Sequence, residues 1–544
     1  MKTHLLLGSV ASAGFLGAAV ATVPVWLAVW LWLLGLLAIF GRRAAGKGVA
    51  VAVMALLLGL HSLLDIDSLW LTNYLLQFAV ILAVFFPKQR PTLQDHSEAD
   101  RPFLAPPAVL NWPWYTRPID AWDRWVWPLH PTVETLQRAW DEAGEESDDD
   151  DDDDDDEKKP EERAKEDEKS MRDTGLRLLA EMLASPKLSS MGRFLLFLVV
   201  PSLMKNRAQV TRFYRDNRVL IKAQGAVRQP LVIVGMPRTG STLLQRLLAC
   251  DPGARATLAF EMEVPLPPLK PGADPKQDPR IQAAKTVSAV FGTLAPGHLE
   301  NYQKSHPWLL EEPEEDFSYT STHMGLIHLM LVHADHWAAP YVRWCLDPSD
   351  KQPVFRYTRR YLEMLGAFRP PASHWVLKSP MYSFYPEQLL REFPDARVVV
   401  THRDPRVVVP SICRLMTSFN LSFYQDYILD QRQVGAANLD VWIETCNRLL
   451  QYRSQQPPKE TQFFDVMYDD LIADPVATVR AIYGHFALPF TPEFEVSMRQ
   501  HLAKDPRVSH GRHSYSLEEF GLTHELIAAK APHYFERYFP RKSD

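Results

Sequence analysis

The sequence has little cysteine and no excess of positive charge, and both absences narrow the class of protein. Four cysteines are scattered over 544 residues, with neither the spacing of a zinc site nor the density of a disulfide scaffold, which suits a reducing compartment. The formal net charge is −7, and one unbroken aspartate run at positions 148–156 accounts for more than all of it. Without that run the chain is nearly neutral, so it lacks the basic footprint of a nucleic-acid-binding protein.

Charged residues are also scarce in the first 90 positions, which predicts a membrane anchor. Apolar runs cover residues 5–40, 49–64 and 69–86, and the first is too long for one span of about 20 residues. With a turn near Pro24, about four transmembrane helices fit residues 1–90. A cleaved signal peptide is the alternative for the first segment, although apolar sequence continues beyond it. The basic residues fall at the N-terminus and in alternate loops, which predicts an integral protein of the inner or plasma membrane whose later residues face the cytoplasm.

Residues 91–170 form a predicted linker between the anchor and the remaining chain. Its first part is rich in proline and tryptophan, which is typical both of a segment at headgroup depth and of tryptophans packed onto a globular domain. The charge block at residues 141–168 predicts a disordered, solvated spacer, with metal binding by the aspartates as a less favoured alternative. A helical lead-in over residues 171–229 and an α/β domain over residues 230–544 are expected to follow.

Residues 231–251, LVIVGMPRTGSTLLQRLLACD, combine a buried strand, a glycine loop and the start of a helix. Loop N–H groups and a helix N-terminus in this order form a cradle for a phosphate. The loop resembles a Walker A motif, GxxxxGK[ST], with Gly235 and Gly240 at the glycine positions. Ser241 replaces the phosphate-binding lysine, however, and Arg238 is the cation of the loop. A glycine turn without a ligand is the alternative.

PRTGST followed by a leucine-rich helix resembles the 5′-phosphosulfate loop of sulfotransferases, which use 3′-phosphoadenosine 5′-phosphosulfate (PAPS). The resemblance includes bacterial and tyrosylprotein enzymes and extends over about residues 230–538. It implies an α/β fold, a P-loop-like three-layer sandwich with a central parallel sheet. It also implies that the loop holds the donor through Arg238, Thr239, Gly240, Ser241 and Thr242.

Two later motifs match the family's donor site. WVLKSP ends a predicted strand at Lys378, which by resemblance stabilises the bridging oxygen as the sulfuryl group departs. Cytosolic members carry a catalytic histidine two residues later, where this chain has Pro380. In RVVVTHRDPRVVVPS, Arg403 and Ser411 have the eight-residue spacing of the family's ligands for the 3′-phosphate. Tyrosylprotein enzymes add an arginine at a position that is leucine here, next to Arg414, which leaves that ligand open.

Without the histidine, the resemblance assigns the catalytic base to a glutamate just beyond the loop helix. Glu261 is favoured over Glu263 for taking the acceptor's proton. The second acidic group, in SHPWLLEEPEEDFSY, is expected to be an acceptor-side segment rather than a metal site. Near the C-terminus, Arg512 is expected to touch the 3′-phosphate, and a helix-capping loop with Ser516 as N-cap and Glu519 at N3 is an equal alternative.

The combined prediction is a membrane-anchored sulfotransferase that moves a sulfuryl group from PAPS, without a metal, to a hydroxyl or amine. Attachment to the bilayer favours a lipid or amphipathic acceptor, which the sequence does not identify. One alternative is a P-loop kinase or nucleotide hydrolase, against which the missing lysine at position 241 counts. The other is a catalytically inactive nucleotide-binding scaffold, against which Arg238, Lys378 and Arg403 count. The oligomeric state is not indicated.

Overall fold

The computed structural model describes residues 131–141, 158–185, 188–270, 272–294, 309–326, 339–349, 351–420, 423, 430–504 and 516–540. The chain divides into two compact units, and all described residues belong to the second. The first unit, residues 1–107 with 113–115, lies outside the described residues, and the predicted membrane spans lie there too. Among the described helices, none is both long enough and apolar enough to cross a bilayer.

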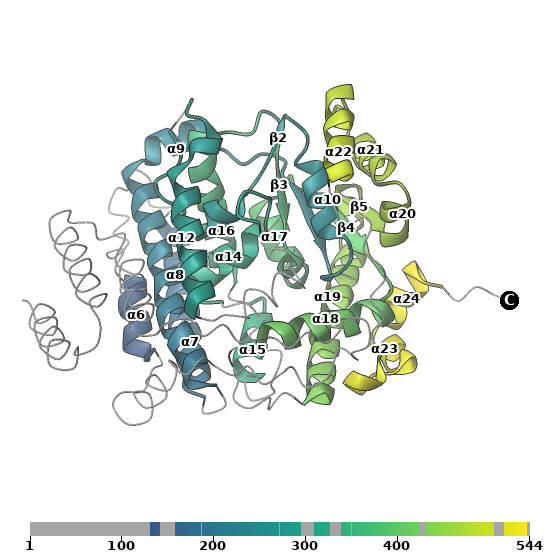
Figure 1. Cartoon of the computed structure of the whole chain (residues 1–544), viewed down its shortest axis with the longest axis horizontal. Helices are drawn as coiled ribbons and strands as arrows, with labels where there is room; N and C mark the ends of the chain where they lie inside the picture. Colours follow the sequence, from purple (N-terminus) through teal and green to yellow (C-terminus); the bar gives the residue numbers. More distant parts are fainter. Residues whose placement is uncertain are drawn as a thin grey trace, which may run out of the picture. The chain divides into compact units, whose positions relative to one another are not determined.

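A five-stranded parallel sheet forms the centre of the described domain (Figure 1). Its strands are β1 (Leu231–Gly235), β2 (Ala254–Ala256), β3 (His374–Lys378), β4 (Arg397–His402) and β5 (Phe463–Met467). Their spatial order is β2-β3-β1-β4-β5, so the chain runs to one side of β1 first and to the other side afterwards. Open α/β sheets bind ligands at such a switch point, outside the carboxyl ends of the strands. The α/β prediction is thus confirmed, although the sequence does not predict the short edge strand β2.

One face of the sheet is covered by the first helix after β1 and by three later helices. They are α10 (Ser241–Leu248), α20 (Tyr468–Ala473), α21 (Pro475–His485) and α22 (Pro492–Lys504), drawn close together in Figure 1. Leu244, Leu247 and Leu248 of α10 are fully buried and share one cluster with Leu231 and Ile233 of β1. The leucine periodicity of this helix therefore predicts its buried face correctly, since residues three and four apart lie on one side.

The opposite face is covered by a different group of elements. They include η6 (Pro380–Phe384), α17 (Pro386–Glu392), α19 (Gln431–Gln455) and α24 (Pro532–Tyr538). Leu449 and Leu450 of α19 lie beside Val400 of β4, where they line a common pocket. Helices on both faces explain why the central strands are continuous apolar runs rather than alternating ones.

The chain before β1 forms a helical layer. It contains α6 (Val133–Asp141), α7 (Lys158–Leu183), α8 (Ser190–Asp216) and α9 (Arg218–Gln224). The expected disordered spacer is therefore wrong from position 158 onward, because α7 begins there. Arg207 of α8 explains the order: it pairs with Glu168 of α7 and stacks on Trp140 of α6, at 4.0 Å from the ring centroid. A partly buried ion pair, itself in contact with an aromatic ring, thus joins α7 to α8, although the charged sequence of α7 predicts a solvated segment.

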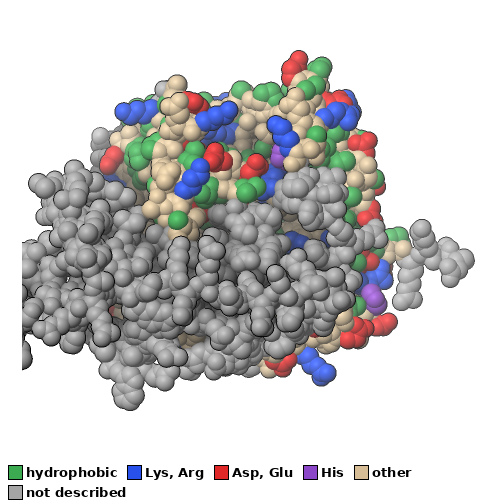
Figure 2. Space-filling view, in the orientation of Figure 1, with side chains coloured by type: hydrophobic (Ala, Val, Ile, Leu, Met, Phe, Trp, Pro, Cys, Tyr) green, Lys and Arg blue, Asp and Glu red, His purple; other side chains and the backbone are tan. Residues whose placement is uncertain are grey.

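The remaining elements connect these layers. They are α11 (Ala259–Glu263), η3 (Pro275–Gln277), α12 (Pro279–Leu294), α14 (Asp316–His323), α15 (Ala339–Leu346), α16 (Gln352–Phe368), α18 (Pro405–Asn420), η7 (Pro457–Gln462), η9 (Glu518–Phe520) and α23 (His524–Lys530). Pro405 is the first residue of α18 and Pro475 is the first residue of α21, where the Asp474 carboxylate accepts the N–H of Ala477 at 2.9 Å. On the face drawn in Figure 2, basic and acidic side chains lie intermixed over the described surface.

Candidate active site

The loop after β1 is shaped by glycine and braced from within. Gly235 has φ +130°, and a Cβ there would lie 2.6 Å from the carbonyl oxygen of Thr401, so only glycine fits. Thr239 is fully buried, and its hydroxyl donates to the carbonyl of Met236 at 2.7 Å and lies 2.6 Å from the hydroxyl of Thr401. The side chain of Thr239 therefore holds the loop against β4 and does not face the space where a ligand would bind.

The start of α10 provides the expected N–H groups. Gly240 is the N-cap, has φ +84°, and offers no side-chain hydrogen bond to the helix. The first N–H groups of α10, which include those of Ser241 and Thr242, are consequently not satisfied by a cap. A helix N-terminus in this state attracts an anion through its N–H groups and its dipole. The backbone of this loop thus suits an oxyanion, as the sequence predicts.

Two arginines and a serine that are distant in sequence meet beside this loop. Arg238 has φ +67°, an uncommon conformation outside glycine, and its Nε donates to the hydroxyl of Ser411 at 3.2 Å. Arg403 donates from Nη1 to the carbonyl of Arg238 at 2.9 Å, and its guanidinium lies 3.9 Å from the ring centroid of Tyr468. The structure therefore brings together Arg238, Arg403 and Ser411. Sequence reasoning missed Tyr468, whose only signal is an aromatic residue directly after β5.

The register of the sheet explains this convergence. Gly235 at the end of β1 pairs with Thr401 of β4, and Ile233 pairs with Lys378 at the end of β3. Parallel strands point their carboxyl ends to one edge, so the loop after β1, the turn after β4 and Lys378 share that edge.

Lys378 has a carboxylate partner that the sequence does not assign. Its Nζ donates to Oε1 of Glu315 at 2.8 Å, with the lysine side chain 2% exposed and the glutamate side chain 12% exposed. The hydroxyl of Ser318 donates to the other oxygen of Glu315 at 2.6 Å. Glu315 belongs to the acidic stretch that is expected on the acceptor side, but its pairing with Lys378 spans 63 positions and has no spacing signal.

Glu261 is enclosed by positive charge. Its side chain is 2% exposed, and Oε1 accepts from Arg255 at 2.8 Å and lies 3.6 Å from Arg280. Oε2 accepts the N–H of Leu258 at 3.1 Å. Burial raises the pKa of this carboxyl, but the charges of Arg255, Arg369 and Arg280 outweigh burial, and the resulting pKa lies below the ordinary value. The role of Glu261 as the base stays a prediction, and its surroundings favour a structural role.

The C-terminal candidates have separate outcomes. Arg512 lies outside the described residues. The capping box expected of Ser516 and Glu519 is wrong, because Ser516 donates to Glu518 at 2.5 Å while Glu519 accepts from Arg414 at 2.9 Å. The pairing with Glu519 also accounts for the guanidinium of Arg414, the arginine adjacent to the open 3′-phosphate position.

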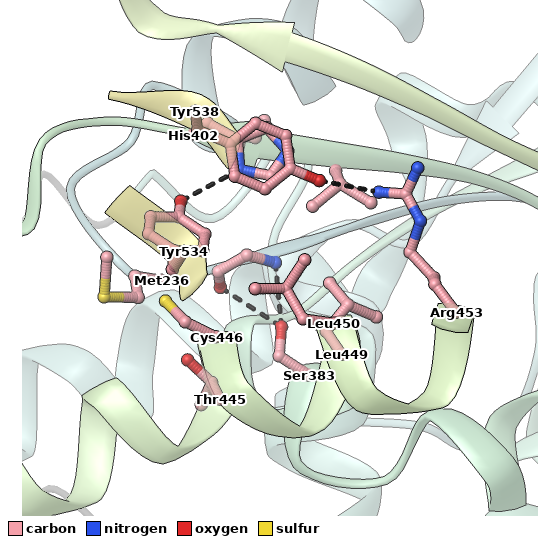
Figure 3. Close-up of a pocket in the computed structure, with 13 residues that line it drawn as sticks. Met236, Ser383, His402, Thr445, Cys446, Leu449, Leu450, Arg453, Tyr534 and Tyr538 are labelled. Atoms are coloured by element: carbon pink, nitrogen blue, oxygen red, sulfur yellow. Dashed lines mark hydrogen bonds between the residues drawn. The ribbon is translucent and has the colours of Figure 1, made fainter. Parts of the chain in front are cut away.

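A small pocket lies at the carboxyl end of β4 under α19 and α24 (Figure 3). His402 is stacked on Tyr538, with ring centroids 3.8 Å apart, and its two nitrogens lie 2.9 Å from the hydroxyl of Tyr534 and 2.8 Å from Asp465. Burial lowers the pKa of His402 although the carboxylate of Asp465 opposes it, so a neutral ring suits both bonds. The pocket borders the loop at Gly235 but contains none of the candidate donor-binding side chains. Its network fastens α24 to the sheet.

The fold and this edge suit an oxyanion in an α/β protein whose loop has Ser241 at the position of the P-loop lysine and Arg238 as its cation. Comparison with known proteins makes the class specific. Residues 230–492 match the model of the sulfotransferase family. Over 306 residues the chain is 25% identical to the omega-hydroxy-beta-dihydromenaquinone-9 sulfotransferase Stf3 of Mycobacterium bovis, which covers 54% of this chain and 72% of that relative.

Two solved structures resemble the described fold. Sulfotransferase STF9 from Mycobacterium avium has a TM-score of 0.60 and 26% identity, and the match covers 75% of this chain and 96% of that one. Sulfotransferase STF1 from Mycobacterium tuberculosis has a TM-score of 0.52 and 25% identity, with 67% and 92% covered. Residues 230–492 are thus similar to the sulfotransferase family, and the chain is an enzyme that transfers a sulfuryl group.

Proposed function

We propose that the enzyme transfers the sulfuryl group of PAPS to a hydroxyl of a lipid or amphipathic acceptor at a membrane. The observation that carries the proposal is the convergence of Arg238, Arg403 and Ser411 beside the N-terminus of α10, with Lys378 on the neighbouring strand end. PAPS presents a dianionic 3′-phosphate and a 5′-phosphosulfate, and this edge offers separate cations for the two.

In this proposal the loop and α10 hold the 5′-phosphosulfate. The backbone N–H groups of Gly240, Ser241 and Thr242 bind its oxygens, and Arg238 neutralises their charge. Arg403 and Ser411 bind the 3′-phosphate, because a guanidinium fork and a hydroxyl match a phosphate dianion. Arg512 is a further proposed ligand of the 3′-phosphate. Lys378 stabilises negative charge on the bridging oxygen as the bond to sulfur breaks.

The acceptor is proposed to be a hydroxylated isoprenoid or a similarly apolar alcohol. The name of the Stf3 relative describes a hydroxylated menaquinone as its substrate, and this supports the lipid class for the present chain. The apolar runs in residues 5–86 support a second element of the proposal, that the N-terminal region anchors the enzyme in the inner or plasma membrane with the transferase domain on the cytoplasmic side.

Donor binding tests the first element directly. Adenosine 3′,5′-bisphosphate is titrated calorimetrically into the full-length wild type, Arg403→Ala and the matched control Arg406→Ala. Arg406 lies in the first turn of α18 and is paired with Asp404 at 2.6 Å, so it offers the same loss of charge at a side chain that already has a carboxylate partner. A charge-assisted hydrogen bond contributes about 1.5–3 kcal/mol, so Arg403→Ala is expected to weaken binding by roughly 10-fold or more. Equal affinities in all three proteins would contradict the assignment.

A transfer assay tests the proposed lipid acceptor. Labelled sulfate from PAPS is offered to the wild-type enzyme with a total lipid extract, and the products are separated by chromatography. Label in an apolar, alkali-stable lipid is expected. Phosphoryl transfer from ATP without binding of PAPS would instead support the kinase alternative, and donor binding without any transfer would support an inactive scaffold.

A further inference from the structure

The backbone that carries Glu315, the carboxylate partner of Lys378, is held by the residue that follows it. Oδ1 of Asp316 accepts the backbone N–H of Lys378 at 2.8 Å, and Oδ2 of Asp316 accepts the hydroxyl of Tyr382. The hydroxyls of Ser318 and Ser379 lie 3.0 Å apart. The residues on both sides of Glu315 and Lys378 are thus tied together, so the distance between the two charges does not depend on long, mobile side chains alone.

The same segment is attached to the phosphate loop's helix. The carbonyl of Glu314 accepts from Gln245 of α10 at 3.1 Å and from the hydroxyl of Thr257 at 3.2 Å. Glu315 therefore lies between the helix that would hold the 5′-phosphosulfate and the strand end that carries Lys378. Fixed geometry of this kind lowers the entropic cost of bringing a reacting group to its target.

Glu315 also has the remaining capacity that a base requires. A carboxylate offers about four lone-pair sites, and the bonds from Lys378 and Ser318 occupy one on each oxygen of Glu315. Glu261, in contrast, is closed off by Arg255, Arg280 and the N–H of Leu258, with almost no exposed surface.

We infer that Glu315 is the general base of the transfer reaction and that Lys378 is shared between Glu315 and the departing phosphate. This inference rests on the proposed function. The acceptor oxygen forms a bond to sulfur, the bond from sulfur to the bridging oxygen breaks, and its electron pair remains on the 5′-phosphate of the leaving nucleotide. The acceptor's proton passes to the carboxylate of Glu315 and then to solvent. Lys378 moves its hydrogen bond toward the bridging oxygen as negative charge develops there.

The test compares Glu315→Gln with Glu311→Gln in the full-length protein. Glu311 lies four positions earlier, pairs with Lys285 at 3.0 Å, and is more than half exposed, so it controls for loss of charge in this stretch. Sulfuryl transfer from labelled PAPS is measured to a long-chain primary alcohol and to a series of phenols of decreasing pKa. Glu315→Gln is expected to lower kcat toward the alcohol by about 10²–10⁴-fold and to leave the affinity for adenosine 3′,5′-bisphosphate unchanged.

The dependence on acceptor pKa separates a base from a structural group. An acidic phenol needs less help to lose its proton, so the deficit of Glu315→Gln is expected to shrink along the phenol series. A deficit that is equal for all acceptors, or a kcat within threefold of wild type for the alcohol, would overturn the inference. If Glu315→Gln does not fold, Glu315→Asp keeps the carboxylate, and its deficit must follow the same trend. Absence of transfer by the wild type would refute the proposed function instead.

Discussion

Replacing Glu261 by glutamine separates its structural role from a catalytic one. The substitution keeps the size of the side chain and an oxygen for the N–H of Leu258, but it leaves the buried cation of Arg255 without its anion, whereas Arg280 keeps its pair with Asp278 at 2.7 Å. Breaking one side of a buried ion pair costs about 3–5 kcal/mol, because an uncompensated charge stays behind. We therefore expect Glu261→Gln to lower the free energy of unfolding by roughly that amount and to leave kcat of the folded enzyme near the wild-type value.

Urea unfolding followed by fluorescence, together with kcat measured below the transition, checks both halves of this expectation. Glu263→Gln is the matched control, since it lies on the same short helix α11 and is only half-buried. Its free energy of unfolding is expected to change by less than about 1 kcal/mol. An unchanged stability of Glu261→Gln combined with a large loss of kcat would refute the structural reading and restore Glu261 as the base.

Two further predictions concern stability. His323 is fully buried, and burial lowers its pKa to about 3, so folding favours the neutral ring; the stability this provides is complete above about pH 6.5 and is lost as the pH falls. Between pH 7.5 and pH 5.5 this loss is about 1.4 kcal/mol. The unfolding free energy of the wild type, measured relative to that of His323→Phe, is expected to fall by that amount over this range. A difference between the two proteins that stays constant with pH would contradict the prediction. Gly435→Ala would place a Cβ 2.0 Å from the carbonyl oxygen of Phe520 and is expected to cost about 1–3 kcal/mol or more in thermal or urea unfolding. The control is Gly484→Ala in helix α21, where an added Cβ would have no heavy atom within 4 Å, and it is expected to stabilise the protein by about 0.5–1 kcal/mol. Equal effects of the two substitutions on the unfolding free energy would show that the clash at Gly435 is relieved.

The parts of the fold that could be predicted are those whose signal is local. The strands β1, β3 and β4 are continuous apolar runs because both faces of the sheet are covered, and α10 shows its buried face through leucine spacing. β2 has only three residues and an arginine at its centre, and therefore gives no run to recognise. The start of α7 is missed for a different reason. The charged composition around position 158 predicts a spacer, and the pairing of Glu168 with Arg207 of α8 has no signal in the local sequence.

In the candidate site too, contacts within one local unit could be predicted from the sequence, and contacts between distant segments could not. Arg403 and Ser411 lie on one strand–turn–helix unit, so their spacing in sequence already limits their distance in space. The contact of Arg238 with Ser411 crosses 173 positions and follows only from the parallel pairing of β1 with β4. Glu261 shows why a single position is not enough. The motif identifies a glutamate, but the arginines that neutralise its charge come from β2 and from the first turn of α12, and no local sequence pattern predicts that pairing.

The strand end at Lys378 shows how the chemistry of the site is distributed. In the cytosolic sulfotransferases the lysine and the histidine base lie on one strand end, whereas Pro380 occupies the histidine position here and begins η6. In its place, Ser379 and Tyr382 bind the start of α14, which brings Glu315 to the lysine from a separate segment. The described donor ligands of the proposal lie on the loop after β1, at the start of α10, in the turn after β4 and on α18, and none of them lies on α14. In this proposal the base and the nucleotide ligands come from different elements, and Lys378 links the two. Changes at the start of α14 are therefore expected to alter the acceptor chemistry more than the binding of the nucleotide.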